Sequence, residues 1–216
     1  MVGMRSEARL AAPLLALPWV MGIEIGGGQS AGGLAAARQL IGHGADGLLS
    51  FGLAAGLVDA APAGTLLCPD EVVVDGQAYP VDPALASRLA ARGNRQPLLH
   101  SSRVVTSAAR KRALAAGGRF AGLDMESGMV AEAASAAGIG FAVLRAVCDP
   151  VSRDLPDAAA QALDAGGGVA MVRLGLAVLR RPTLIGALIA LGGDAARARR
   201  ALGEAVRRIA GPTGSC

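Results

Sequence analysis

The pattern of apolar and polar positions predicts helices and strands that alternate along the chain. The clearest pair follows residue 123, where a helix is expected from about Ser127 to Ala137 and a strand over Gly140–Val147. Asp124 suits the helix N-cap, and Gly138 suits its end, because glycine readily takes the left-handed conformation that closes many helices. The strand is apolar, partly β-branched and unbroken, which is typical of a strand buried on both faces.

The same alternation is expected through the rest of the chain. In order, the pattern predicts a very short strand at Val2–Met4, a strand near Trp19–Ile25, a helix from about Ser30 to Gly42, strands within Asp46–Leu57 and Thr65–Val74, and a short strand at His100–Thr106 before a basic helix that contains Lys111. Strands that alternate with helices indicate an α/β protein.

Composition supports one domain and excludes several functional classes. At 216 residues, with 52% hydrophobic and 18% charged residues, the chain can bury a full core and is not expected to be disordered. Aromatic residues make up 2%, too few for the ring stacking of single-stranded nucleic-acid binders, so no nucleic-acid partner is expected despite the net charge of +4. The 2 histidines and 3 cysteines lack metal-ligand spacing, which favours a reducing compartment and no metal site.

Both ends of the chain carry apolar segments. Arg5 and Arg9 precede an apolar run, as in a signal peptide, but Pro13 and Pro18 interrupt the run and no clean cleavage site follows. At the other end, residues from about 169 to 210 show helical periodicity and many arginines, and no uncharged run approaches the length of a membrane span. We expect an amphipathic helical region that either packs on the domain or lies in a membrane interface, with its arginines towards anionic head groups.

Two carboxylates flank the helix–strand pair. A helix of about 12 residues covers roughly 18 Å, and about 7 strand residues cover roughly 23 Å, so the chain goes out along the helix and comes back along the strand. Glu126 and Asp149 are therefore expected near the same edge of the sheet, where open α/β sheets bind ligands. The alternative is that Glu126 stabilises the helix start electrostatically and Asp149 begins a turn with Pro150; spacing alone favours that alternative.

This segment resembles a known signature. Met125, Glu126, Arg145 and Asp149 match the M-E-[GS]…[VI]-R-A-[IV]-[SC]-D pattern of the nucleoside phosphorylase and nucleosidase superfamily, which includes purine and uridine phosphorylases and methylthioadenosine/adenosylhomocysteine nucleosidases. The run G-M-R-S-E-A that ends at residue 8 and the glycine-rich turn at residues 25–30 are similar to two further segments of these proteins, and the arginine-rich tail extends the likeness to hopanoid-associated phosphorylases. The resemblance implies a three-layer αβα sandwich with a mixed, partly barrel-like central sheet, in a single domain spanning residues 1–216.

The resemblance also implies roles for individual residues. Asp149 would be the general acid that protonates N7 of the purine, Glu126 would accept hydrogen bonds from the 2′ and 3′ hydroxyls, and Glu7 would orient or deprotonate the attacking water. The alternative for Glu7 is an exposed residue of an amphipathic first helix. Arg145 is expected to hold the structure near Asp149. The implied substrate-binding residues are Met125, Gly27, Gly28, Gly52, Leu53, Ala54, and Val104 or Val105 in the place of an aromatic ring that stacks on the purine.

The function implied by the resemblance is cleavage of the N-glycosidic bond of adenosylhopane, which releases adenine and a ribosyl-hopanoid in hopanoid side-chain biosynthesis. Leu53 stands where the family commonly has a phosphate-binding serine, and Gly64-Thr65 replaces a Gly-Asp pair; both departures leave hydrolysis open and count against phosphorolysis. One alternative is phosphorolysis, with inorganic phosphate held by Gly27, Gly28 and Arg5. A methylthioadenosine/adenosylhomocysteine nucleosidase is another, and a non-catalytic, membrane-associated nucleoside-binding protein is the alternative outside this class.

The chemistry needs no metal or redox cofactor, and inorganic phosphate is the one co-substrate to consider. The expected partner is a small lipid nucleoside. The resemblance implies a homodimer in the cytoplasm, and the tail adds peripheral contact with an anionic inner membrane through the apolar stripe of Leu184, Ile185, Leu188, Ile189 and Leu191.

Overall fold

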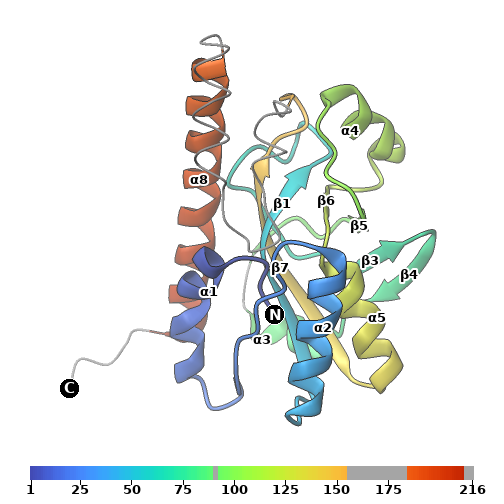
Figure 1. The fold of residues 1–216 in the computed structure, drawn as a ribbon, viewed down its shortest axis with the longest axis vertical. Coiled ribbons are helices and arrows are strands. Elements are labelled where there is room, and N and C mark those ends of the chain that lie inside the picture. Colours follow the sequence, from blue (N-terminus) through green and yellow to red (C-terminus); the bar gives the residue numbers. More distant parts are fainter. Residues whose placement is uncertain (90–91, 155–183, 212–216) are drawn as a thin grey trace.

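The computed structural model describes residues 1–89, 92–154 and 184–211, and through this part of the chain runs a central sheet of seven strands (Figure 1). Their order across the sheet is β2-β7-β1-β6-β5-β3-β4. The strands are β1 (Gly47–Gly56), β2 (Leu66–Leu67), β3 (Glu71–Val74), β4 (Gln77–Pro80), β5 (Leu98–His100), β6 (Gly122–Asp124) and β7 (Gly140–Asp149). The two long strands, β1 and β7, are neighbours and parallel, so their carboxyl ends meet at the same edge.

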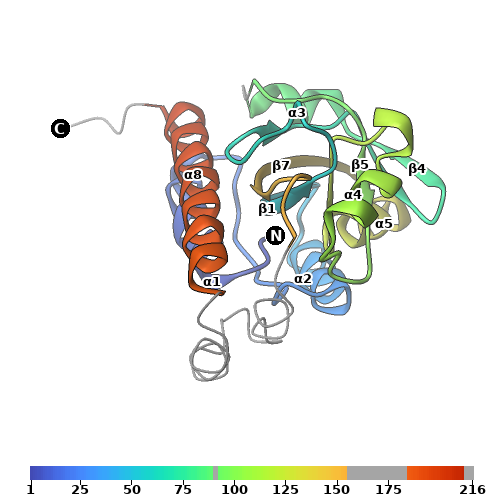
Figure 2. The same cartoon turned by 90° about the horizontal axis from the view of Figure 1, so that it is seen from above.

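The sheet is mixed, as the resemblance implies. β1 is parallel to β7 but antiparallel to β6, whereas β5 is parallel to both of its neighbours, β3 and β6. The edge strands β2 and β4 are antiparallel to β7 and β3. Seen from above, the sheet curls instead of lying flat (Figure 2). The expected mixed, partly barrel-like sheet is confirmed.

Helices cover both faces of this sheet. The described α-helices are α1 (Arg5–Ala11), α2 (Ser30–Gly42), α3 (Pro83–Arg88), α4 (Ala108–Leu114), α5 (Ser127–Ala137) and α8 (Leu184–Ala210), with short 3-10 turns at Ala12–Ala16 and Ala116–Gly118. The long helix α8 lies with α1 on one face, and α2 packs beside α5 on the other (Figures 1 and 2). The three-layer αβα arrangement is therefore confirmed.

The core forms where the sequence is most continuously apolar. β7 is buried over almost its whole length, as an unbroken apolar run predicts for a central strand. Helix α8 packs against β7, α1 and the 3-10 turn that follows α1. Its buried stripe recurs at helical spacing and consists of Ala198, Leu202, Ala205 and Val206. The C-terminal half of the tail helix therefore packs on the domain.

The elements around the predicted site form as expected. Helices α2 and α5 begin and end at the residues predicted for them, and β7 contains the predicted strand. Gly138 closes α5 in the left-handed conformation with φ +67°. The N-cap position of α5 is Glu126, not Asp124, but the Asp124 carboxylate accepts the backbone N–H of Ser127 at 3.1 Å and so satisfies the first turn.

Two strands predicted near the N-terminus do not form. Val2 makes single bridges to Ile25 and Phe51, and neither Val2–Met4 nor Trp19–Ile25 continues as a ladder. The chain leaves the sheet because the backbone N–H of Met4 donates to the Glu7 carboxylate at 2.8 Å, which starts helix α1.

Two other predicted strands are placed differently. Thr65–Val74 forms β2 and β3, which lie in different parts of the sheet. The strand predicted at His100–Thr106 is β5, and it ends at His100, because the Ser101 hydroxyl donates to the Arg103 carbonyl at 2.7 Å and turns the chain. The predicted basic helix follows as α4 and contains Lys111.

The arginine-rich tail is described from residue 184 onwards. Residues 169–183 of the predicted helical region, with Arg173, Arg180 and Arg181, lie outside the described residues. Within α8, Ile189 is 70% exposed, whereas Leu188 and Leu191 are half-buried. In the described part of the chain, no helix combines the length and hydropathy that crossing a bilayer requires.

Candidate active site

A buried arginine organises the polar side chains near the carboxyl ends of β1 and β7. Arg145 lies on β7 opposite Gly52 of β1 and is 1% exposed. Its Nε lies 2.9 Å from Oδ2 of Asp124, and Nη1 and Nη2 each donate to Oε2 of Glu126 at 3.2 Å. Burial lowers the pKa of Arg145, but the carboxylates of Asp124 and Glu126 outweigh burial and raise it above its ordinary value. The guanidinium is therefore a fixed cation.

Two buried serines complete the environment of Arg145. Nη2 donates to Oγ of Ser50 at 2.7 Å, and Nε donates to Oγ of Ser127 at 3.3 Å. The Ser127 hydroxyl in turn donates to Asp124 at 2.5 Å. Arg145 is thus tied to the start of α5, and the expectation that it holds the structure near Asp149 is wrong. The β7 register separates the two residues by four positions, about 13 Å along a strand.

Glu126 is held from several sides. Arg145 binds Oε2, and the backbone N–H of Gly28 donates to Oε1 at 3.0 Å. A Cβ atom on Gly3 would lie 2.6 Å from both carboxylate oxygens, so only glycine fits there. Burial raises the pKa of Glu126, although the nearby charge of Arg145 acts in the opposite direction. Since a carboxylate has about four lone-pair sites and three donors occupy Glu126, one site is left for a further hydroxyl donor.

Glu7 approaches the same place from helix α1. Its Oε1 accepts the backbone N–H of Leu53 at 2.8 Å, while Oε2 accepts that of Met4. A Cβ atom on Gly52 would lie 2.6 Å from Oε1 of Glu7 and 2.7 Å from Nη1 of Arg145, so both side chains converge on this glycine. Glu7 does lie in the first helix, as the alternative interpretation expected. The alternative is wrong about exposure, because the side chain is only 2% exposed.

Asp149 ends β7 and is held by a lysine. It pairs with Ala55 in the β1–β7 register and is 8% exposed. The ammonium of Lys111, which is fully buried, donates to Oδ1 of Asp149 at 2.6 Å and to the carbonyls of Pro150 at 3.1 Å and Arg153 at 2.8 Å. Burial raises the pKa of Asp149 above its ordinary value, while the hydrogen bond and charge of Lys111 act against burial.

The structure therefore brings Glu7 and Glu126 together around Arg145 and places Asp149 further along β7. Sequence reasoning missed Lys111 as the partner of Asp149. The two residues are 38 positions apart, and a lysine between Arg110 and Arg112 on a short helix has the pattern of a solvated face. Only the packing of α4 on the segment after β7 removes Lys111 from water.

The other predicted binding residues are distributed around this region. Gly52, Leu53 and Ala54 lie on β1 beside Arg145, and the carbonyl of half-buried Met125 accepts the Ser30 hydroxyl at 3.0 Å. Gly27 and Gly28 adopt positive φ, of +78° and +76°, and the N–H of Gly28 already serves Glu126. Val104 is 40% exposed, whereas Val105 packs against an apolar cluster that includes Leu57 and Phe120; Arg5 is exposed.

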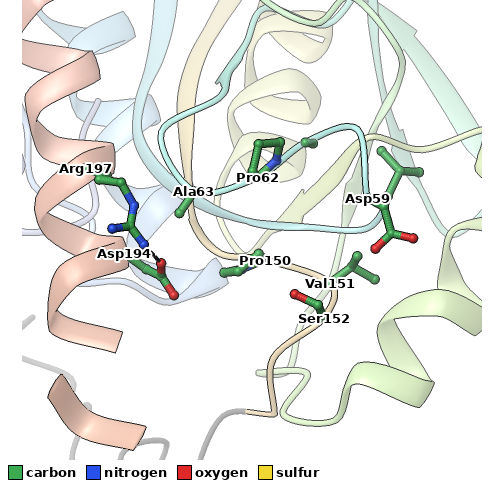
Figure 3. Close-up of a pocket in the computed structure, with 10 residues that line it drawn as sticks. Asp59, Pro62, Ala63, Pro150, Val151, Ser152, Asp194 and Arg197 are labelled. Carbon is green, nitrogen blue, oxygen red and sulfur yellow. Dashed lines mark hydrogen bonds and ion pairs between the residues drawn. The ribbon is translucent and has the colours of Figure 1, made fainter. Parts of the chain in front are cut away.

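A cavity of about 190 Å³ lies beside the end of β7 (Figure 3). Its lining comes from the loop after β1, the segment after β7 and helix α8. On its α8 side, buried Asp194 pairs with Arg197 and lies 2.6 Å from Nε of Arg153. Pro150 contributes to the wall, but the three candidate carboxylates do not, so this cavity is separate from the predicted nucleoside site.

The described residues show no cluster of side chains that could bind a metal ion. Among the described residues no three His, Cys, Asp or Glu side chains gather to hold a metal ion. Burial raises the pKa of Cys68 to about 11 and that of Cys148 to about 12, so both thiols stay protonated at neutral pH. That the protein works without a cofactor stays a prediction.

Comparison with known proteins identifies the fold. No protein-family model and no curated protein matches the sequence. Solved structures do: the 5′-methylthioadenosine/S-adenosylhomocysteine nucleosidase of Neisseria meningitidis, in complex with methylthio-immucillin-A, superposes with a TM-score of 0.64 at 15% identity over 96% of both chains. The S-adenosylhomocysteine nucleosidase of Streptococcus pyogenes, in complex with 5-methylthiotubericidin, gives 0.62 at 15% identity over 96% of this chain and 94% of that one. The chain has the nucleosidase fold.

Futalosine hydrolase of Helicobacter pylori shares this fold as well. Its TM-score is 0.63 at 14% identity, over 96% of this chain and 95% of that chain. The fold expected from the resemblance is thus confirmed. Membership of the superfamily and the likeness to hopanoid-associated phosphorylases stay predictions.

Proposed function

We propose that the protein cleaves the N-glycosidic bond of a purine nucleoside, with adenosylhopane as the substrate and adenine and a ribosyl-hopanoid as the products. The observation that carries the proposal is the convergence of two buried carboxylates, Glu7 and Glu126, on Arg145, with a third carboxyl group, Asp149, at the end of the same strand. Buried charges are costly and are retained in proteins mainly where they are paired or used. The fold, shared with nucleosidases, supports this chemistry by analogy.

The sugar would meet Glu126. As the bond breaks, positive charge develops on the ribose. A carboxylate that accepts a hydrogen bond from a ribose hydroxyl stabilises that charge more in the transition state than in the ground state. Arg145 and the N–H of Gly28 fix the orientation of Glu126 before substrate arrives. Met125, the residue before Glu126, supplies an apolar side chain for the sugar face.

The purine would meet Asp149. Adenine is a poor leaving group as an anion, so a proton on N7 lowers the barrier, and a carboxyl group can supply it only if its pKa lies near the operating pH. Burial shifts the pKa of Asp149 in that direction. Arg145 and Asp149 are separated by about 13 Å along β7. A bound nucleoside would lie between them, with its sugar near Glu126 at the Arg145 end and its base near Asp149.

Glu7 would act on the nucleophile. Both of its oxygens accept backbone N–H groups, which fixes the carboxylate in position to orient a water molecule. Leu53, whose N–H serves Glu7, has no hydroxyl to offer a phosphate ion. Water is therefore favoured over phosphate as the nucleophile.

Adenine release from adenosylhopane tests this mechanism, and we expect it to proceed without phosphate. In Glu7→Gln the rate should fall about 100-fold or more, because the attacking water loses the carboxylate that orients it. Inorganic phosphate should not restore the rate, because Leu53 stands where a hydroxyl would bind the ion. Products are identified by mass, as ribosyl-hopanoid or its 1-phosphate. Glu204→Gln makes the same change on an exposed residue of α8 and should behave as wild type. Phosphate-dependent cleavage retained in Glu7→Gln would instead establish phosphorolysis, and the absence of cleavage with either nucleophile would reject the proposal.

A methylthioadenosine/adenosylhomocysteine nucleosidase is the second candidate, because two of the solved structures with this fold are such enzymes. The same carboxylates would serve it, and only the 5′ substituent differs. Methylthioadenosine belongs in the same assay as a competing substrate, and a higher kcat/KM for it than for adenosylhopane would assign the protein to this activity.

A lipid nucleoside lies in a bilayer, so we also propose that α8 touches an anionic membrane from the cytoplasmic side. Ile189 presents an apolar side chain to solvent, and exposed Arg197, Arg199 and Arg200 follow it on the same helix. Basic residues near an anionic surface each contribute about 1 kcal/mol. A homodimer is the assembly that the family resemblance implies.

Vesicle sedimentation tests the membrane contact. The protein should bind phosphatidylglycerol-containing vesicles at low salt and dissociate as salt rises. Ile189→Ser should weaken binding by about tenfold to 100-fold, since burying such a side chain contributes about 1.5–3 kcal/mol. Met21→Ser removes another exposed apolar side chain outside α8 and serves as the control. Equal binding to neutral and anionic vesicles at low salt would contradict the electrostatic part.

A further inference from the structure

The proposed mechanism leaves the contact between Lys111 and Asp149 unused, although Asp149 is its general acid. Lys111 is fully buried, and its ammonium has three described acceptors: Oδ1 of Asp149 and the carbonyls of Pro150 and Arg153. An ammonium group has three hydrogens, so its donors are all satisfied. These three hydrogen bonds fix both the position and the orientation of the Lys111 ammonium group.

Helix α4 is docked on the segment after β7 at a second point. The backbone N–H of Ala108, in the first turn of α4, donates to Oδ1 of Asp154 at 2.7 Å. Both ends of the 149–154 segment are therefore tied to α4, and a change in the position of Lys111 would be transmitted directly to the carboxyl group of Asp149.

The charges around Asp149 come from three elements. α4 supplies Lys111, the segment after β7 supplies Arg153, and α8 supplies Asp194. Arg153 lies 2.6 Å from Asp194 and is paired with it, so Lys111 is the cation in direct contact with Asp149. Burial favours the protonated carboxyl group, and Lys111 favours the ionised one.

We propose that Lys111 is a positioning residue for base protonation: it fixes Oδ1 of Asp149 and supplies the counter-charge that lets this buried carboxyl group both give up and regain a proton at neutral pH. The inference rests on the proposed function. In each turnover Asp149 transfers its proton to N7 of the purine as the glycosidic bond breaks. The attacking water forms a bond to the anomeric carbon and gives a proton to Glu7, which releases that proton to solvent. Asp149 then takes a proton back from solvent. Without the ammonium, burial alone would hold the proton too tightly for efficient transfer.

The pH dependence of kcat/KM for adenine release tests the counter-charge. An opposite charge within about 4–6 Å lowers the pKa of an aspartate by about 1–3 units. Lys111→Met removes the charge at similar volume, so the basic limb of the profile, where Asp149 loses its proton, should move to higher pH by at least about one unit. Lys111→Arg keeps the charge and should leave the limb in place. If Lys111 were merely structural, Lys111→Met would lose rate or stability with the limb unmoved, and that result would overturn the proposal.

A second measurement needs no turnover, because it follows the two side chains directly. In the wild-type protein, the ¹³Cγ resonance of Asp149 and the ¹⁵Nζ resonance of Lys111 should shift with the same midpoint as pH is lowered, with Asp149→Asn used for assignment. Independent midpoints would overturn the ion pair. If no nucleoside is cleaved but the midpoints coincide, the proposed function fails while the coupling of the two side chains holds.

Discussion

Asp149→Asn should reduce adenine release about 100-fold to 10,000-fold, the range that a general acid usually contributes. The side chain amide has nearly the shape of the carboxyl group and can still accept the hydrogen bond from Lys111, but it has no acidic proton for N7. The rate is measured at saturating nucleoside, where the loss appears in kcat. Activity within about tenfold of wild type would mean that the general acid lies elsewhere.

Stability has to be separated from chemistry in this variant. Asp149→Asn leaves the buried ammonium of Lys111 without its counter-ion, and breaking a buried pair from one side is destabilising by about 3–5 kcal/mol. The double variant Lys111→Met with Asp149→Asn removes both charges and should regain much of the free energy of unfolding while remaining inactive. Asp59→Asn changes an aspartate that is largely exposed and should be normal in both respects.

Arg145→Met should also strongly destabilise the protein, with a loss of about 3–5 kcal/mol in the free energy of unfolding. The variant leaves Asp124 and Glu126 buried, 5% and 4% exposed, without the cation that both contact. It also deprives the Ser50 hydroxyl of the guanidinium donor. Urea unfolding followed by circular dichroism measures the change, and Arg200→Met, on the exposed side of α8, is the matched control.

The same experiment tests the arrangement of the site. Arg145→Met combined with Glu126→Gln removes one of the two stranded charges, so part of the loss should be regained. If the single variant loses less than about 1 kcal/mol, the value typical of an exposed ion pair, Arg145 is not the buried centre that the structure describes.

Sequence alone determined the central elements of this fold. The apolar run before Asp149 has no polar interruption except Arg145, and such a run is typical of a strand covered on both faces. The helix before it is bounded by residues whose local chemistry stops and starts helices: Gly138 takes φ +67°, and Asp124 accepts an N–H of the first turn. These are short-range effects, and so the pattern predicts them well.

Tertiary structure decided where the remaining strands begin and how the charges pair. Val2–Met4 could have continued as a strand, but Glu7 takes the backbone N–H of Met4 and starts a helix. The local sequence pattern does not predict that Lys111, a lysine between two arginines, is buried. It also does not predict that Arg145 pairs with Glu126 and not with Asp149. Those choices depend on α4 packing on the segment after β7 and on α5 beginning beside Arg145. The two ion pairs join residues that are 38 and 19 positions apart. Electrostatic pairing in a protein interior depends on distance in space, and only the folded chain sets that distance.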